Sequence, residues 1–192
     1  MSHLAAALAP HLEVDPRPEP APGDRLAAVL AVVIDDADPA VLLTERAANM
    51  SRHAGEMSFP GGLQDPADAD LRATALRETH EEIGVDPGQL SVIGALPPIH
   101  TFVSAILVTP FVATVPRMPD LAISGGEIAR VLTAPIRRLS AAEEQRVLRD
   151  DREGVWRGWW YELPDATVWG ATGSMVHALL ALIRREAPWV LQ

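Results

Sequence analysis

Three glutamates stand close together in the stretch RETHEEIG, residues 77–84. On a helix, Glu78, Glu81 and Glu82 are spaced i, i+3 and i+4, which places their side chains within one arc of about 100 degrees. Repulsion at this spacing costs only a few tenths of a kcal/mol on an open helix surface, so a solvated acidic face is one interpretation. The alternative is a divalent cation between them, because Mg2+ prefers oxygen ligands and is commonly held by a few carboxylates together with substrate phosphates.

A pair of glycines precedes this stretch in FPGG, residues 59–62. Glycine permits unusual backbone angles and close approach, so a main-chain carbonyl here can complete the shell of an ion and main-chain amides can face a phosphate. Most Pro-Gly-Gly turns are only turns. The combination with an acidic helix-capping position and with Arg-Glu-x-x-Glu-Glu-x-Gly favours the metal-binding interpretation.

The elements on either side position these residues. The apolar run 26–34 predicts a buried strand, and the segment from Ala40 to Arg46 predicts the next. The glycine- and proline-rich stretch 52–70 predicts a loop with at most a short strand near 57–59. A helix follows, capped by an Asp at 68 or 70 and ended by Gly84 and Pro87.

The rest of the chain predicts one α/β domain. Strands are expected at 90–96, 105–115, 126–136 and 157–163, with a loop at 97–104 and a short helix or an exposed loop at 139–151. A helix over 170–186 ends the pattern. We expect residues 1–25 to form a proline-rich tail and residues 26–192 to form the domain.

Composition narrows the range of partners. The net charge of -10 argues against nucleic acid and against anionic lipid, and no strongly apolar run approaches the roughly 20 residues that span a bilayer. The chain has no cysteine, which excludes disulfides and thiolate chemistry and is compatible with a reducing cytosol. We therefore expect a cytoplasmic protein whose partner is a small molecule.

Residues 61–85 resemble the Nudix box, the signature of hydrolases that cleave a nucleoside diphosphate linked to another group. The stretch departs from the box in three ways: the loop acid is Asp68 instead of glutamate, it stands one residue farther from Arg77, and Thr79 replaces an apolar residue. The resemblance implies the Nudix fold, an α/β/α sandwich with a mixed curved sheet between the box helix and the C-terminal helix. It also implies Mg2+ (or Mn2+) as cofactor.

Residues 42–62, LLTERAANMSRHAGEMSFPGG, resemble the extended signature of the coenzyme A pyrophosphatase branch of this family. The segments LPP (96–98), VTP (108–110) and VWGATG (168–173) also look like landmarks of that branch. The resemblance implies hydrolysis of coenzyme A or an acyl-CoA to (acyl) 4'-phosphopantetheine and adenosine 3',5'-bisphosphate. The branch's usual basic position is Ser51 here, with Arg52 beside it.

The resemblance assigns roles to individual residues. It implies Glu78 and Glu82 as the principal metal ligands, Glu81 as a sharing ligand or the holder of a second ion, and the Gly61 carbonyl as a further ligand. Arg77 is expected to orient a box glutamate, and the general base is either a box glutamate or Glu127. The residues expected at the substrate's phosphates are Arg46, Arg52, Gly61 and Gly62.

Two other functions remain open at this stage. One is a Nudix hydrolase acting on ADP-ribose, a dinucleotide or a nucleoside triphosphate, although the general box does not require LLTER or FPGG. The other is a non-catalytic nucleotide-binding domain, which would be expected to lose box glutamates that are present here. The apolar C-terminus APWVLQ suggests packing, with a homodimer as one arrangement.

Overall fold

The computed structural model describes residues 2–48, 54–101, 105–123, 126–150 and 154–192. Its main sheet has the strand order β3-β2-β1-β7-β5, while β4 pairs with β1, β6 with β7 and β8 with β2. Strands β1 and β7 are parallel and the other pairs are antiparallel. The strands of this sheet are β1 (Arg25–Ile34), β2 (Ala40–Arg46), β3 (Met57–Ser58), β4 (Gly61–Leu63), β5 (Ser91–Ala95), β6 (Ile99–Thr101), β7 (Ile106–Val115) and β8 (Ile128–Pro135).

Strand β1 lies at the centre and is buried on both faces. Its odd-numbered residues 27–33 belong to one apolar cluster and its even-numbered residues 28–34 to a second one on the opposite face. A strand with two covered faces needs no polar alternation, which explains its continuous apolar sequence.

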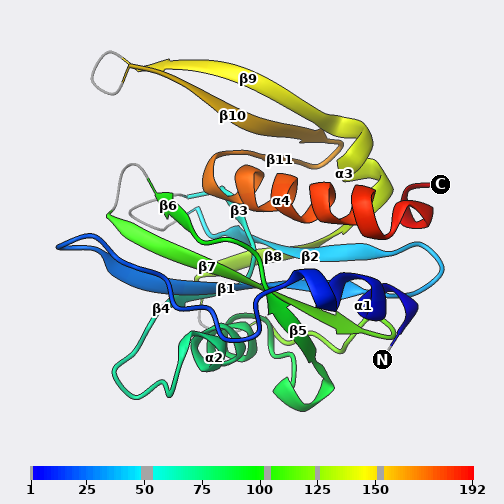
Figure 1. Ribbon diagram of the computed structural model, residues 1–192, viewed down its shortest axis with the longest axis horizontal. Helices are drawn as coiled ribbons and strands as arrows, with labels where there is room; N and C mark the ends of the chain where they lie inside the picture. The colour runs from blue at the N-terminus through cyan, green and yellow to red at the C-terminus, as the bar shows by residue number, and fades with distance from the viewer. Residues whose placement is uncertain (1, 49–53, 102–104, 124–125, 151–153) are drawn as a thin grey trace.

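Two helices cover the two faces of the sheet (Figure 1). Helix α2 (Leu71–Ile83) packs on one face, and helix α4 (Gly170–Glu186) packs on the other. The mixed sheet between the box helix and the C-terminal helix confirms the predicted sandwich. Asp70 caps α2 by accepting a hydrogen bond from the Ala73 amide at 2.7 Å, and Gly84 ends the helix, so its predicted limits are also correct.

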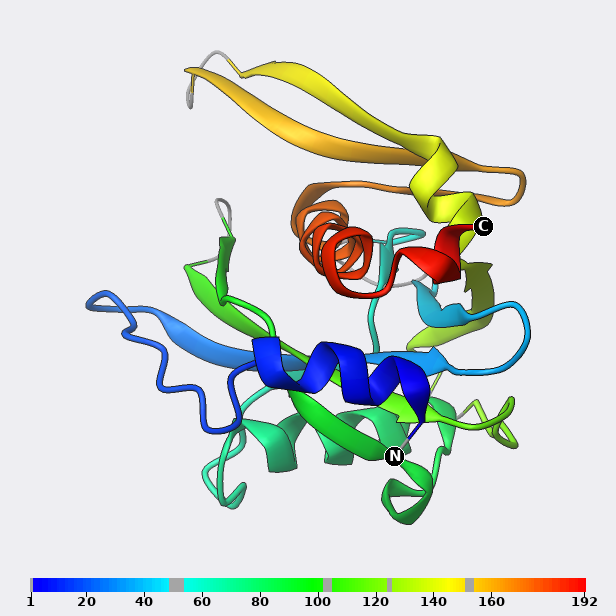
Figure 2. The same ribbon diagram turned by 45° about the vertical axis from the view of Figure 1, so that its right-hand side comes forward.

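A second sheet, of order β11-β10-β9, extends beyond α4 and α3 (Ile136–Ala142) (Figures 1 and 2). It consists of β9 (Glu143–Asp150), β10 (Gly154–Leu163) and β11 (Ala166–Val168). The prediction of a short helix or exposed loop at 139–151 is therefore wrong over β9. The charged sequence of β9 has low intrinsic strand preference, and pairing with β10 overrides it.

The first residues do not form an unpacked tail. Ser2 caps α1 (His3–Leu8), which continues into η1 (Ala9–His11), and Leu4 and Leu8 lie in the core. Glu13 then pairs with Ala95 at the edge of the main sheet. The tail prediction is wrong for these residues because their leucines and alanines bury apolar surface, while the division of the chain at residue 25 stays a prediction.

The C-terminus packs on its own chain. After α4, the segment η3 (Pro188–Leu191) places Val190 in the core, next to Ala187. A homodimer stays a prediction.

The remaining short helix, η2 (Pro87–Gln89), links α2 to β5. Within the described ranges no helix is long and apolar enough to cross a bilayer.

Candidate active site

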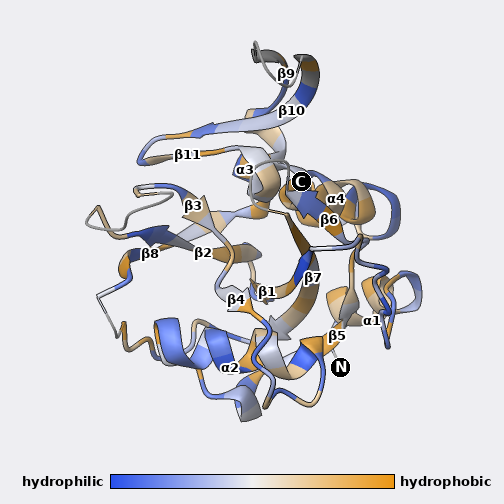
Figure 3. Ribbon diagram, turned by 90° about the vertical axis from the view of Figure 1, so that its left-hand side faces the viewer, coloured by the Kyte–Doolittle hydropathy of each residue, from blue (hydrophilic) through white to orange (hydrophobic). Residues whose placement is uncertain are grey.

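Arg77 is the centre of a hydrogen-bonded network on the polar side of α2, which is hydrophilic in Figure 3. Its Nε and Nη2 atoms donate to the two carboxylate oxygens of Asp68, each at 2.9 Å. Its Nη1 atom donates to Glu78 at 2.8 Å and to Glu81 at 3.0 Å. The pairing lowers the pKa of Asp68 well below its usual range and raises the pKa of Arg77.

Asp68 binds Arg77, whereas Asp70 caps the helix. Besides accepting from Arg77, Asp68 accepts hydrogen bonds from the Thr74 hydroxyl at 2.9 Å and from the Asp65 amide at 2.9 Å. Its side chain is only 6% exposed. Asp68 ties the loop to the helix and fixes the guanidinium, a role that the sequence analysis did not assign.

The glycine pair, Gly61 and Gly62, lies directly against Glu82 and Glu78. The Gly61 amide donates to Glu82 Oε2 at 3.1 Å. A Cβ atom on Gly62 would lie 2.6 to 2.7 Å from the carboxylate atoms of Glu78, so only glycine leaves room for that carboxylate. At Gly61, φ is 149° and a Cβ would lie 2.4 Å from the Ala28 carbonyl oxygen.

Glu82 is the carboxylate of the group whose pKa is raised. Burial raises its pKa to about 7, and the negative charges of Glu78 and Glu127 act in the same direction. The Gly61 hydrogen bond and the positive charge of Arg46 oppose this shift. The electrostatic contributions show that the fold gathers Glu78, Glu82, Glu127 and Arg46 around one point.

A backbone hydrogen bond and the pairing of Arg46 with Ile128 bring Arg46 and Glu127 close together. Arg46 ends β2, and the amide of the next residue, Ala47, donates to the Glu127 carbonyl at 2.8 Å. The Nε atom of Arg46 is buried and has no hydrogen-bond partner within the described part of the chain. A buried cationic donor left without a partner is suited to an anionic oxygen of a ligand. Arg52 lies outside the described residues.

Glu81 is placed differently from its two neighbours. Its side chain is 57% exposed and is paired with Arg77. Among the described residues, no three acidic or imidazole side chains are gathered closely enough to hold a metal ion. Glu81 lies at the outer edge of the arc, where the Nη1 atom of Arg77 binds both it and Glu78. Its part in holding an ion stays a prediction.

The donor set that remains still suits a hard divalent cation. Glu78 and Glu82 are oxygen donors on successive turns of α2, and both carboxylates lie against the backbone of the glycine pair. The burial and mutual repulsion that raise the pKa of Glu82 are relieved by a positive charge at this place. We retain Glu78, Glu82 and the Gly61 backbone as the residues that would hold the ion.

Thr79, the departure from the apolar position of the box, is fully buried. Its hydroxyl donates to the Ala75 carbonyl at 2.7 Å, one turn earlier in the helix. The polar group is thereby satisfied inside the core, so threonine is accommodated on the buried side of α2.

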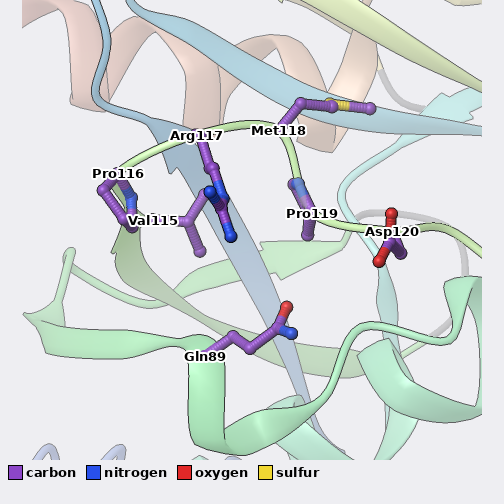
Figure 4. A pocket seen from close by; sticks show the side chains of 7 residues that line it. All are labelled: Gln89, Val115, Pro116, Arg117, Met118, Pro119 and Asp120. Carbon is purple, nitrogen blue, oxygen red and sulfur yellow. The ribbon is translucent and has the colours of Figure 1, made fainter.

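A hollow elsewhere on the surface does not belong to this site. It has a volume of about 350 Å3 and is lined by Gln89 and residues 115–120 (Figure 4). None of the carboxylates described above lines it. The candidate site is thus defined by converging charges and backbone contacts.

Comparison with known proteins agrees with this geometry. The model of the NUDIX domain matches residues 24–166, so the chain belongs to the Nudix family. The chain is 39% identical over 161 residues to a protein of Cronobacter sakazakii named "Uncharacterized Nudix hydrolase NudL", with 81% of each chain covered.

Two solved structures share the fold. A NUDIX hydrolase from Alicyclobacillus acidocaldarius is 25% identical, with a TM-score of 0.51 over 62% of this chain and 83% of that one. The NUDIX domain of Shewanella oneidensis NrtR, solved in complex with ADP ribose, is 21% identical, with a TM-score of 0.51 over 73% of this chain and 88% of that one. The protein is a Nudix hydrolase, and such hydrolases generally use divalent metal ions such as Mg2+ or Mn2+.

Proposed function

We propose that the protein hydrolyses the pyrophosphate bond of coenzyme A or an acyl-CoA, releasing (acyl) 4'-phosphopantetheine and adenosine 3',5'-bisphosphate. The observation that carries this proposal is the position of Arg46. It ends the strand formed by LLTER, it acts electrostatically on Glu82, and its buried Nε has no partner within the described residues. The two halves of the extended signature support it, because Thr44 pairs with Ser58 and Glu45 with Met57 just before the glycine pair.

Hydrolysis of a pyrophosphate requires neutralised oxygens and a water placed in line with one phosphorus. Glu78 and Glu82 would hold a divalent cation, which supplies charge neutralisation and a template for the phosphates when it is bound. Arg77 keeps the Glu78 carboxylate in place through its bond at 2.8 Å. Arg46 binds a phosphate oxygen of the substrate, together with Arg52, whereas the Gly61 amide is already bonded to Glu82.

Glu127 is our candidate for the acceptor of the water's proton. Its charge acts on Glu82, and it lies outside the helix that supplies the two proposed ligands. A Glu127→Gln variant should therefore lose turnover while its metal affinity changes little. Loss of metal binding in that variant would instead make Glu127 a ligand and leave the proton to a box glutamate.

The direct test is a product assay with Mg2+ on coenzyme A, ADP-ribose and a nucleoside triphosphate. Release of adenosine 3',5'-bisphosphate from coenzyme A, lost in Glu82→Gln, is the expected result. Glu81→Gln is the matched control on the same helix and should lose less activity, because Glu81 points to solvent and to Arg77. Cleavage of ADP-ribose or of the triphosphate in place of coenzyme A would refute the substrate assignment and leave the hydrolase.

A further inference from the structure

A stack of one guanidinium and two indoles lies outside the carboxylate site. The rings of Trp160 and Trp169 are stacked with centroids 5.2 Å apart and an interplanar angle of 20°. The Arg146 guanidinium carbon lies 5.2 Å from the centroid of Trp160. Because β9 and β11 flank β10 on opposite sides, Arg146 and Trp169 approach Trp160 from opposite sides of its strand.

The cationic end of this stack is fixed by carboxylates. Arg146 Nη2 lies 2.7 Å from Glu144, and its Nη1 lies 3.2 Å from Glu162. Glu162 in turn accepts a hydrogen bond from the Thr167 hydroxyl at 2.8 Å. Arg146 is thus held by two acidic side chains, and the order of the strands places Trp169 at the other end of the stack.

The Trp169 end of the stack is open. Its side chain is 39% exposed, which is unusual for the largest apolar side chain. A Cβ atom on the following residue, Gly170, would meet nothing within 4 Å among the described residues, so the backbone next to Trp169 is uncovered at this point. The exposed part of the indole is accessible to a ligand.

This open end is on the side of the molecule that leads to the carboxylates. Trp169 directly follows β11, and β11 lies against β3, the strand that enters the glycine pair. Arg130 reinforces the connection, because it donates both to Glu45, the neighbour of Arg46, and to the Asp165 carbonyl just before β11. The contact between β11 and β3 connects the element that precedes Trp169 with the element that precedes the glycine pair.

We propose that Trp169, backed by Trp160 and Arg146, stacks the nucleobase of the substrate. A purine ring matches an indole face in size and planarity, and stacking of this kind is tolerant of which base is present. The inference rests on the proposed function only in that the ligand is a nucleotide. Because the base is remote from the bond that is cleaved, the stack contributes to binding of the substrate and of the transition state alike and should affect KM more than kcat.

The test compares Trp169→Ala and Trp169→Phe with the wild type on coenzyme A, with the melting temperature measured for each. We expect Trp169→Ala to raise KM about ten- to a hundredfold with kcat nearly unchanged, and Trp169→Phe to restore most of the affinity. Trp189→Ala is the matched control. Trp189 is 41% exposed and stacks on His3 at 4.5 Å, so its loss should leave KM unchanged.

Comparing inhibition by a fragment with the base and a fragment without it measures the contribution of the nucleobase to binding. Adenosine 5'-monophosphate should inhibit the wild type more strongly than ribose 5-phosphate does, and Trp169→Ala should remove that difference. An unchanged KM in a folded Trp169→Ala variant, or an advantage of the base that survives the substitution, would overturn the inference. If the alanine variant does not fold, Trp169→Leu, which keeps apolar bulk without an aromatic face, decides in the same way.

The outcome is separable from the substrate assignment. If the protein cleaves ADP-ribose and not coenzyme A, the same variants are compared on ADP-ribose, so the coenzyme A proposal fails while the stacking site is still tested. If coenzyme A is cleaved and its KM is indifferent to Trp169, the substrate assignment stands and the stacking site is refuted.

Discussion

The two helices that cover the main sheet are held in place by different forces. Helix α4 buries eight of its 17 residues, and six of these, all apolar, belong to the larger apolar cluster. Helix α2 buries only five of its 13 residues, two of them threonines, and its loop is tied to it by the bonds from Asp68 to Arg77 and Thr74. Apolar packing provides stability but tolerates small shifts, whereas hydrogen bonds and close backbone contacts fix individual atoms. The side of the sheet covered by α2, which carries the candidate active site, is therefore the one whose side chains are fixed by individual hydrogen bonds.

The largest effect on stability is expected on the α4 side. Leu179 is 1% exposed, so Leu179→Ala should lower the free energy of unfolding by about 3 kcal/mol. Urea denaturation measures the loss, and kcat per folded molecule should stay at the wild-type value. A fall in kcat at full folding would show that α4 acts on the site directly and would break the contrast between the helices.

The largest effect on activity is expected at the glycine pair. Gly62→Ala places a Cβ atom within 2.7 Å of the Glu78 carboxylate and forces it aside. Displacing a catalytic group by about 1 Å costs roughly a hundredfold in rate. Steady-state kinetics should show this loss. Gly23→Ala, where nothing described lies within 4 Å of the added atom but φ is 93°, should cost stability and keep full activity per folded molecule. Equal activities in the two variants would mean that Glu78 need not lie where the structure has it.

A smaller effect is expected from pH, through the pairing of Asp68 with Arg77. The folded-state pKa of Asp68 is lowered, chiefly by its hydrogen bonds with Arg77, so the stabilisation is fully present above the unfolded pKa of about 3.9. It is lost as pH falls from there through the folded pKa. The wild type should therefore be more stable than Asp68→Asn at neutral pH, and acid titration of unfolding should show the gap narrowing below about pH 4. A gap that is independent of pH would show that the charge of Asp68 is not what stabilises the loop.

The smallest effect is expected for Thr79→Val, which restores the apolar type that the family pattern has at this place. The hydroxyl donates to a carbonyl within its own helix, so its removal leaves no isolated donor. The free energy of unfolding should change by less than about 1 kcal/mol, and kcat/KM should not change. Thermal unfolding measures the change in stability, and steady-state kinetics measure kcat/KM. A large loss of activity would place Thr79 among the residues that position Glu78 and Glu82.

Strong local signals made much of the fold predictable. The unbroken apolar run of β1 and the capping signals of Asp70 and Gly84 each specify an element without help from distant residues. Strand β9 could not be predicted, because its charged residues become a strand only by pairing with β10. Helix α1 was missed although Ser2 followed by alanines and leucines is a helix-start signal.

The site shows the same division. The periodicity of α2 brings Glu78, Glu81 and Glu82 to one side, but it cannot show that Glu81 is 57% exposed while Glu78 is 20% exposed, with Arg77 bound to both. Nor could spacing show that Asp68 binds both oxygens of its carboxylate to Arg77, since that depends on the path of the loop. The catalytic and metal-binding roles of these residues stay predictions until the variants are measured.

The pairing of Glu13 with Ala95 has a consequence for how the protein behaves at high concentration. Strand β5 ends the main path of the sheet, and Glu13 exchanges backbone hydrogen bonds with it at 3.0 and 2.8 Å. An uncovered strand edge offers its backbone groups to a strand of another molecule and so promotes aggregation. The N-terminal segment covers the edge of β5 at Ala95, so shortening the chain past residue 13 should promote self-association both by uncovering this edge and by removing the buried Leu4 and Leu8 from the core.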